Sequence, residues 1–294
     1  MTDLAPTEPQ RIIGYINGKP ISRDDIYRVM APQLSGEALA EVALDRLLSQ
    51  RLAEQGLAID AGAIESERLK LVQSLSDDEN QAAGMLDQMR EQRGLDDARF
   101  QAMLQRNAAL RALIREEVRV ADAAVRQAYE LAYGPRYRVR LLVTPTAAGA
   151  TRARQAALGG ESFSTLAARL STDTSRAQGG LLSPISPADT SYPKVIRDSL
   201  PSLSTDSPED KLSPVLALDT GFALLYLEQV IAAKDTPYER VEAELRNAVR
   251  LQLERVQMQQ LARSLLEQAN IIVLDPILKP GWERQLQAIR RGGG

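Results

Sequence analysis

The residue types that most often carry catalysis are missing from this chain. Its 294 residues include no histidine and no cysteine. A Ser-His-Asp triad, a Cys-His pair, a structural zinc site and a histidine proton shuttle are therefore excluded. Any activity has to come from carboxylates, hydroxyls, amines, backbone groups or the shape of a pocket. This indicates a protein that handles other polypeptide chains more than one that makes and breaks bonds.

The remaining candidate groups have ordinary structural interpretations. Gly179-Gly180 predicts a tight backbone turn, because no Lys-Ser/Thr pair follows that would complete a phosphate-binding loop. Paired carboxylates fall at expected helix ends or on exposed helix faces, where acidic side chains need no catalytic explanation. These pairs are Asp77-Asp78, Asp96-Asp97 and Glu116-Glu117. No cofactor motif is found, so we expect neither a cofactor nor a metal.

Length and composition predict a globular protein of about two domains. The net charge of −3, with acids and bases interspersed, provides no basic field for nucleic acid. No apolar run approaches the roughly 20 residues of a membrane span. The polar start lacks the apolar region of a signal peptide, so the chain is either cytoplasmic or has lost a signal or anchor. The absence of cysteine is compatible with an oxidising compartment.

The first elements are predicted from strand, turn and cap signals. Residues 12–16 predict a strand, and Asn17-Gly18 predicts a hairpin turn because both residues tolerate positive φ. Ser22 with Asp25 three residues later predicts a helix start of the capping-box type. Helices are then expected at about 36–56, 61–76, 80–92 and 96–118, and from 122 to just before Gly134.

The periodicity changes at Tyr137, where 137–143 alternates as a strand does. Helices near 147–158, 162–170 and 195–200, strands at 215–217 and 222–227, and a long helix over 236–268 follow. The segment 271–274 predicts a last strand, whose backbone needs a hydrogen-bonding partner. The strand at 12–16 is the expected partner. Both ends of the chain would then form one domain, with the middle inserted into it.

Several motifs, in order, resemble the SurA/PrsA class of bacterial foldases, in which a parvulin-type prolyl isomerase domain lies within a helical chaperone domain. The N-terminal segment 14–22 (GYINGKPIS) is similar to the family opening, and 47–52 (LLSQRL) to its first helix. The parvulin part is more specific. Its motifs are found at 160–167 (GESFSTLA), 171–173 (STD), 179–181 (GGL), 212–215 (LSPV) and 220–222 (TGF).

The chain departs from this family at the positions where parvulins carry the polar residues of their pocket. The first strand of a parvulin carries a histidine before an apolar run, and the matching position here is Arg140, or Leu141 if the register shifts by one. The last strand carries a histidine after a Gly-aromatic pair, and Ala223 stands there. Asp173 matches the third polar position and Thr220 its hydroxyl neighbour. With both histidines replaced, the resemblance implies a degenerate pocket that has lost useful isomerase activity.

Two of these polar positions have alternative interpretations. Asp173 is either the surviving pocket carboxylate or a turn residue that caps a helix. Arg140 either pairs with Asp173 or faces water from an alternating strand. The loop 201–210 is longer than the usual turn of the family and is expected beside the proline pocket.

The resemblance also implies a set of apolar residues that line the proline pocket and bind substrate. Each of them could equally be an ordinary core residue, most of all Ile196. The four residues are Tyr192, Val195, Ile196 and Phe222.

The fold class that follows is α+β. The resemblance implies a SurA-N-like helical chaperone domain, formed by 11–134 and 231–276, with a parvulin-like domain inserted at 135–230. The inserted domain is expected to hold a four-stranded antiparallel sheet plus helices. Disordered residues 1–10 and a tail over 277–294 complete the expected organisation.

The expected function is a foldase-type chaperone that binds unfolded or nascent polypeptide, mainly through the helical domain. Flexible methionines there (Met85, Met89 and Met103) suit promiscuous apolar binding, although core packing is the default role of a helical methionine. One alternative is an active prolyl isomerase with an atypical pocket, and another is a structural subunit docked on a dedicated partner. The resemblance implies the periplasm or cell envelope.

Overall fold

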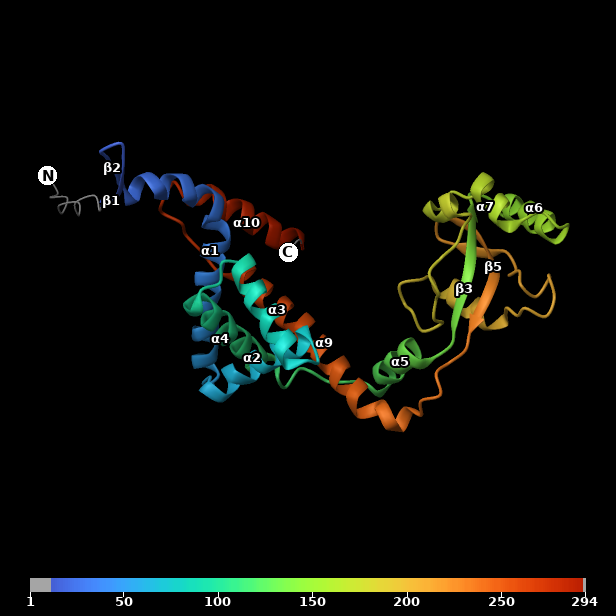
Figure 1. Ribbon diagram of the computed structural model, residues 1–294, viewed down its shortest axis with the longest axis horizontal. Coiled ribbons are helices and arrows are strands. Elements are labelled where there is room, and N and C mark those ends of the chain that lie inside the picture. Colours follow the sequence, from blue (N-terminus) through green and yellow to red (C-terminus); the bar gives the residue numbers. More distant parts are fainter. Residues whose placement is uncertain (1–11, 293–294) are drawn as a thin grey trace. The chain divides into compact units, whose positions relative to one another are not determined.

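The computed structural model describes residues 12–292, so the expected disordered segment 1–10 lies outside the described residues. The chain forms two compact units (Figure 1). We call the first the helical unit; it contains the described residues up to Arg119 together with those from Gln252 onward. The second unit is Val120–Leu251. The mixture of helices with small antiparallel sheets confirms the α+β class.

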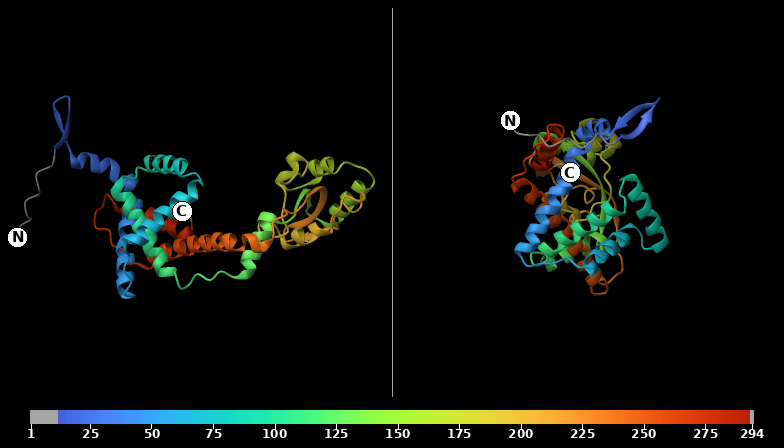
Figure 2. Two further views of the ribbon diagram at one scale, coloured as in Figure 1. Left: turned by 60° about the horizontal axis from the view of Figure 1, so that its bottom comes forward. Right: turned by 90° about the vertical axis from the view of Figure 1, so that its left-hand side faces the viewer.

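A hairpin opens the helical unit, as the Asn-Gly signal predicted. Strands β1 (Ile12–Ile16) and β2 (Lys19–Ser22) pair antiparallel, and φ is +50° at Asn17 and +78° at Gly18. Ser22 then caps helix α1 (Arg23–Glu54): its Oγ accepts from the Asp25 N–H at 3.2 Å, and Asp25 Oδ2 accepts from the Ser22 N–H at 2.9 Å. The helix runs unbroken from this cap, so the start predicted at Ser22 is confirmed, and the helix predicted over 36–56 is the second part of α1. Figure 2 shows α1 continuing directly from the hairpin.

Three further helices, α2 (Ala61–Leu75), α3 (Glu79–Gln92) and α4 (Asp97–Ile114), lie close to their predicted positions. Each begins after an aspartate whose carboxylate accepts the N–H three residues on. These caps are Asp60, Asp78 and Asp96. In the acidic pairs at 77–78 and 96–97, Asp78 and Asp96 are therefore the N-caps of α3 and α4. Two apolar clusters hold the helices, one around Leu48 and Leu110, the other around Phe100 and Leu104.

The predicted pairing of 12–16 with 271–274 is wrong. β1 pairs with β2 across a two-residue turn, which has a far smaller loop-closure entropy than a partner from the other end of the chain. Ile271–Leu274 forms no strand and links α9 (Tyr238–Gln268) to α10 (Lys279–Arg291). The segment expected as a tail thus contains a helix, and its Trp282 is buried against the Leu48 cluster.

Helix α10 approaches α1 closely because both helices present glycine at the contact. A Cβ on Gly281 would lie 1.8 Å from Ser35 Oγ, and one on Gly36 would lie 2.6 Å from the Gly281 carbonyl oxygen. The Ser35 hydroxyl, buried there, donates to the Leu278 carbonyl at 3.3 Å. Nearby, the Tyr27 hydroxyl donates to Asp275 Oδ2 at 2.7 Å. These contacts attach the C-terminal segment to the first helix.

The second unit begins with α5 (Asp122–Tyr133) and is built around an antiparallel sheet of strand order β3-β5-β4. Its strands are β3 (Arg136–Thr144), β4 (Leu216–Leu218) and β5 (Gly221–Ile231). Beyond these three strands, the described residues of this unit show only isolated bridges: one from Leu212 to β5, and two from Leu181 and Ile185 to β3. The segment between them does not follow β3 as a continuous strand, so the four-stranded expectation is corrected to three strands.

The two faces of this sheet carry different side chains, as strand alternation requires. Leu142 and Leu224 pack on α6 (Ala147–Leu158) and α7 (Phe163–Leu170). Leu141 and Leu225 face the other way, toward α8 (Lys194–Ser199) and the segments around Ile185 and Leu200. Helix α9 contributes residues to both units. Among residues 12–292, no helix combines the length and the apolar character that crossing a bilayer demands.

Candidate functional site

A cavity of about 630 Å³ opens on the α8 side of the sheet in the second unit. Its apolar lining comes from β3, β4, α8 and the segment after the double glycine, and its polar lining from the short 3₁₀ helix η1 (Thr174–Gln178) and its neighbours. The lining residues are Leu141, Val143, Thr172, Asp173, Thr174, Ser175, Ala177, Gln178, Leu181, Leu182, Tyr192, Pro193, Ile196, Leu218 and Thr220.

Strand alternation places Leu141, and not Arg140, at the cavity. Residues one apart on a strand face opposite sides of the sheet, so Leu141 and Val143 share the cavity face. Arg140 lies on the other side, where its guanidinium pairs with Glu228 and donates to the carbonyls of Gln178 (3.1 Å) and Gly179 (2.9 Å). Arg140 as a pocket position, and its pairing with Asp173, were therefore wrong. The sequence left Arg140 and Leu141 as alternatives for the first histidine position, and the face of the sheet decides between them.

On β5 the same alternation separates two predicted residues. Ala223 pairs with Val143 in the register and is fully buried in the core cluster that contains Leu141. It belongs to the packed layer on the cavity side without lining the cavity. Phe222 packs on the opposite face, with the cluster of α6 and α7, so its expected place in the pocket wall was wrong.

Asp173 fulfils both interpretations made from the sequence. Its Oδ1 accepts the Ser175 N–H at 2.8 Å, which makes Asp173 the cap of η1, and the residue also lines the cavity. Thr220, from the turn between β4 and β5, lines the same cavity. The two polar positions carried over from the family pattern are thus brought together.

The predicted apolar wall is partly assembled. Tyr192 and Ile196 line the cavity, and Ile196, only 2% exposed, is also a core residue. Val195 packs against the same core cluster without lining the cavity. Sequence reasoning missed Leu181 and Leu182, although the neighbouring Gly179-Gly180 turn signalled a change of chain direction there. It also missed Ser175, whose Oγ is buried and has no hydrogen-bond partner among the described residues.

The long loop 201–210 does not border this cavity. None of its residues belongs to the lining, and Pro208 instead lines a hollow on the α6–α7 side, together with Phe163 and Tyr226. Ser207 Oγ donates to Asp210 Oδ2 at 2.6 Å, which closes the loop on itself. The expectation that the loop lies beside the proline pocket was wrong: Leu203 is buried in the core cluster of the cavity side without lining the cavity, and Pro208 lies on the α6–α7 side.

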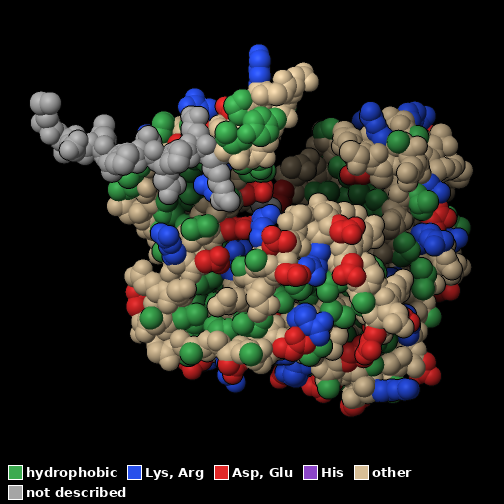
Figure 3. Space-filling view, turned by 60° about the vertical axis from the view of Figure 1, so that its left-hand side comes forward, with side chains coloured by type: hydrophobic (Ala, Val, Ile, Leu, Met, Phe, Trp, Pro, Cys, Tyr) green, Lys and Arg blue, Asp and Glu red, His purple; other side chains and the backbone are tan. Residues whose placement is uncertain are grey.

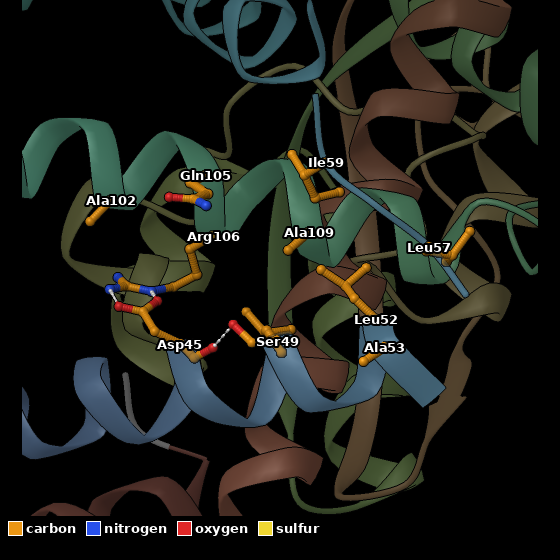
Figure 4. Close-up of a pocket in the computed structure, with 11 residues that line it drawn as sticks. Asp45, Ser49, Leu52, Ala53, Leu57, Ile59, Ala102, Gln105, Arg106 and Ala109 are labelled. Carbon is orange, nitrogen blue, oxygen red and sulfur yellow. Dashed lines mark hydrogen bonds and ion pairs between the residues drawn. The ribbon is translucent and has the colours of Figure 1, made fainter. Parts of the chain in front are cut away.

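A second candidate site is a groove of about 370 Å³ in the helical unit (Figure 4). It lies between α1 and α4, with Leu57 and Ile59 of the connection to α2 at one end. Its lining includes Leu48, Leu52 and Ala109. At the other end the Arg106 guanidinium donates two hydrogen bonds to the Asp45 carboxylate, from Nε to Oδ1 at 2.7 Å and from Nη2 to Oδ2 at 3.0 Å. Ser49 and Gln105 also belong to the lining, so the groove is apolar toward Leu57 and Ile59 and polar, with a neutralised ion pair, toward Asp45 and Arg106.

Exposed apolar side chains extend the binding potential of the helical unit. They lie on the hairpin and on the first half of α1, and each is at least 40% exposed. These residues are Ile12, Ile13, Tyr15, Ile16, Ile26, Val29, Met30 and Leu34. Figure 3 shows acidic and basic side chains intermixed on one face of the molecule, with no broad region of a single sign. Such a surface suits apolar polypeptide better than a strongly charged partner.

The three methionines of α3 and α4 that the sequence singled out divide between core and surface. Met89 and Met103 pack against the cluster of Leu86, Phe100 and Leu104, which is the default role. Met85 is 40% exposed. The described residues hold no group of acidic side chains arranged to bind a metal ion.

Comparison with solved structures finds PrsA proteins and SurA-like chaperones among those similar to this chain. The chain is similar to the peptidylprolyl isomerase PrsA of Bacillus cereus at 20% identity and a TM-score of 0.43, over 95% of this chain and 99% of that one. PrsA of Bacillus subtilis follows at 16% identity and a TM-score of 0.39, over 94% and 99%. A structure described with PEB4 and Cj1289, SurA-like chaperones of Campylobacter jejuni, is similar at 18% identity and 0.32, over 90% and 100%.

These similar structures are described as PrsA proteins and as SurA-like chaperones. No family model matches the chain, and neither does any curated protein.

Proposed function

We propose that the protein is a foldase-type chaperone whose helical unit binds extended apolar segments of unfolded or nascent polypeptides. The observation that carries this proposal is the apolar groove between α1 and α4, accompanied by exposed apolar side chains on the hairpin and α1. Burying such surface against a client is favourable by about 25 cal/mol per Å². The sequence resemblance supports the periplasm or cell envelope as the compartment.

Suppression of the aggregation of a chemically denatured client tests this proposal. Ala102 lines the groove from α4, and Ala102→Glu places a charge within it. Its neighbour Gln101 is exposed and outside the lining, so Gln101→Glu adds the same charge to the same helix as a control. We expect Ala102→Glu to require severalfold more protein for equal suppression, and Gln101→Glu to behave as the unaltered chain. A chain that suppresses no aggregation would contradict the chaperone and favour a subunit dedicated to one partner.

The cavity of the second unit supports a second role, the holding of proline-containing segments with little acceleration of their isomerisation. The wall formed by β3, β4 and α8 is apolar, with Leu141 in the lining and Ala223 buried behind it, where an active isomerase would carry polar groups. Isomerisation has a barrier of about 20 kcal/mol and requires the amide to lose its planarity. A protease-coupled assay on a prolyl peptide distinguishes the alternatives, since substantial turnover would favour an active isomerase that uses Asp173 and Thr220.

A further inference from the structure

The cavity of the second unit carries a single charge. Among its lining residues only Asp173 is ionisable as an acid or base near neutral pH. Its Oδ1 accepts a hydrogen bond from the Ser175 N–H at 2.8 Å. Within residues 12–292, no lysine or arginine forms an ion pair with this carboxylate. The polar edge of the cavity is therefore negative and uncompensated by the chain itself.

The cations around the cavity are engaged elsewhere or stay outside its lining. Arg140 pairs with Glu228 on the other face of the sheet and donates to two backbone carbonyls. Lys194, beside Pro193 of the wall, pairs with Asp198 one helical turn on. Arg176 of η1 is exposed and absent from the lining. Arg197 of α8 donates to the carbonyls of Tyr192 and Pro187 and is likewise absent from the lining, so Asp173 is the one charged side chain that lines the cavity.

A second polar group lies at the same edge. Ser175 belongs to the lining, and its Oγ, which is buried, makes no hydrogen bond to any other described residue. A hydroxyl is both a donor and an acceptor, and a buried hydroxyl without a partner is unfavourable. A peptide carbonyl in the cavity would accept this hydrogen bond while its neighbouring side chain reached the carboxylate of Asp173.

We infer that the cavity selects polypeptide segments in which lysine or arginine adjoins a proline, with Asp173 as the residue that determines this preference. The inference rests on the proposed binding of prolyl segments by this cavity. Unlike charges attract and like charges repel across a recognition surface, so a basic neighbour is favoured and an acidic one is rejected. Because Asp173 is partly exposed, the effect is a modest preference and not an absolute requirement.

Three peptides that differ at one position measure the preference. Acetylated and amidated Ala-Lys-Pro-Phe, Ala-Gln-Pro-Phe and Ala-Glu-Pro-Phe are titrated into the isotope-labelled whole chain at low ionic strength, and dissociation constants are obtained from NMR shifts. We expect the lysine peptide to bind about fivefold more tightly than the glutamine peptide and the glutamate peptide about fivefold more weakly. The spread should shrink in about 1 M salt, where the screening length is about 3 Å.

The substitution Asp173→Asn assigns the preference to one residue. Asparagine also caps a helix start, so η1 keeps its cap while the charge is removed. We expect the affinities for the lysine and glutamate peptides to fall within about twofold of each other. Asp235→Asn is the matched control, because it removes the same charge from an exposed position of the second unit outside the lining, and there the order should persist.

The outcomes separate this inference from the proposed function. Equal binding of the three peptides to the unaltered chain would reject the charge preference and leave prolyl binding standing. Binding of none of them would reject both. A preference that survives Asp173→Asn would overturn the role of Asp173, and a loss of preference in Asp235→Asn would show a general charge effect in its place.

Discussion

The two units of this molecule use apolar residues in opposite ways. In the second unit, side chains on both faces of the sheet are almost completely covered, and all but one of the largest fully buried side chains belong to it, the exception being Leu48. In the helical unit the balance is reversed. Among the described residues, nearly all large exposed hydrophobic side chains lie there, and only Leu158, Leu170 and Val230 belong to the second unit. A closed core and an open apolar surface are therefore segregated along one chain.

The helical unit also contains charge in its interior, which the cores on either side of the sheet avoid. Arg111 of α4 donates to both oxygens of Glu67 on α2, at 2.5 and 3.0 Å, and also pairs with Glu254 on α9. Both glutamates are buried. Burial raises the pKa of Glu67, but hydrogen bonds from Arg111 and Lys70 outweigh it and lower that pKa below its ordinary value. The helical unit is thus held by a polar junction of three helices in addition to apolar packing.

The largest expected effect comes from breaking that junction. Arg111→Ala removes the guanidinium that two buried carboxylates share, while Lys70 stays beside Glu67 at 3.0 Å, so we expect a destabilisation near the lower end of the roughly 3–5 kcal/mol typical of a broken buried pair, about 3 kcal/mol. We expect the unfolding transition of the helical unit to move to much lower denaturant while that of the second unit stays in place. Arg68→Ala, which removes an exposed ion pair with Glu65 on α2, should cost no more than about 0.5 kcal/mol. A shift of both transitions together would contradict the expected independence of the two units, because it would show that they unfold as one.

A smaller effect is expected where α10 meets α1. Gly281→Ala places a methyl group on the Ser35 hydroxyl, and such overpacking costs about 1–3 kcal/mol. Loss of α10 from the α1 contact should appear as a red shift of Trp282 fluorescence, since this is the one tryptophan of the chain and it is buried. Gly84→Ala in α3 is the control: its Cβ would meet nothing within 4 Å, so it should stabilise slightly. Equal behaviour of the two variants would show that the close approach of the helices is dispensable.

The smallest expected effect concerns the cavity of the second unit. Leu141→His with Ala223→His places two imidazoles on the cavity side of the sheet, and we expect prolyl isomerisation, measured by NMR exchange, to accelerate about tenfold over the unaltered chain. Arg140→His with Ala223→His should add nothing, because position 140 faces α6 and α7. Circular dichroism establishes that both variants are folded. Acceleration by the position 140 variant alone would reverse the assignment of the two strand faces.

Local signals determined much of this fold. The Asn17-Gly18 turn, the Ser22 cap with Asp25, and the strand of alternating residues from Tyr137 act over a few residues, so the sequence predicted them close to where the structure has them. The likeness to foldases also rested on short motifs of fixed spacing. These features depend on backbone conformations that particular side chains favour whatever surrounds them.

Long-range packing decided the rest. The sequence could not choose between Arg140 and Leu141, because one residue of register exchanges the two faces of a sheet and only the packed layers distinguish them. It could not foresee that Ile271–Leu274 would be left without a strand partner, or that Gly36 and Gly281 would meet. Such outcomes follow from which surfaces find complementary partners, and that competition involves residues hundreds of positions apart.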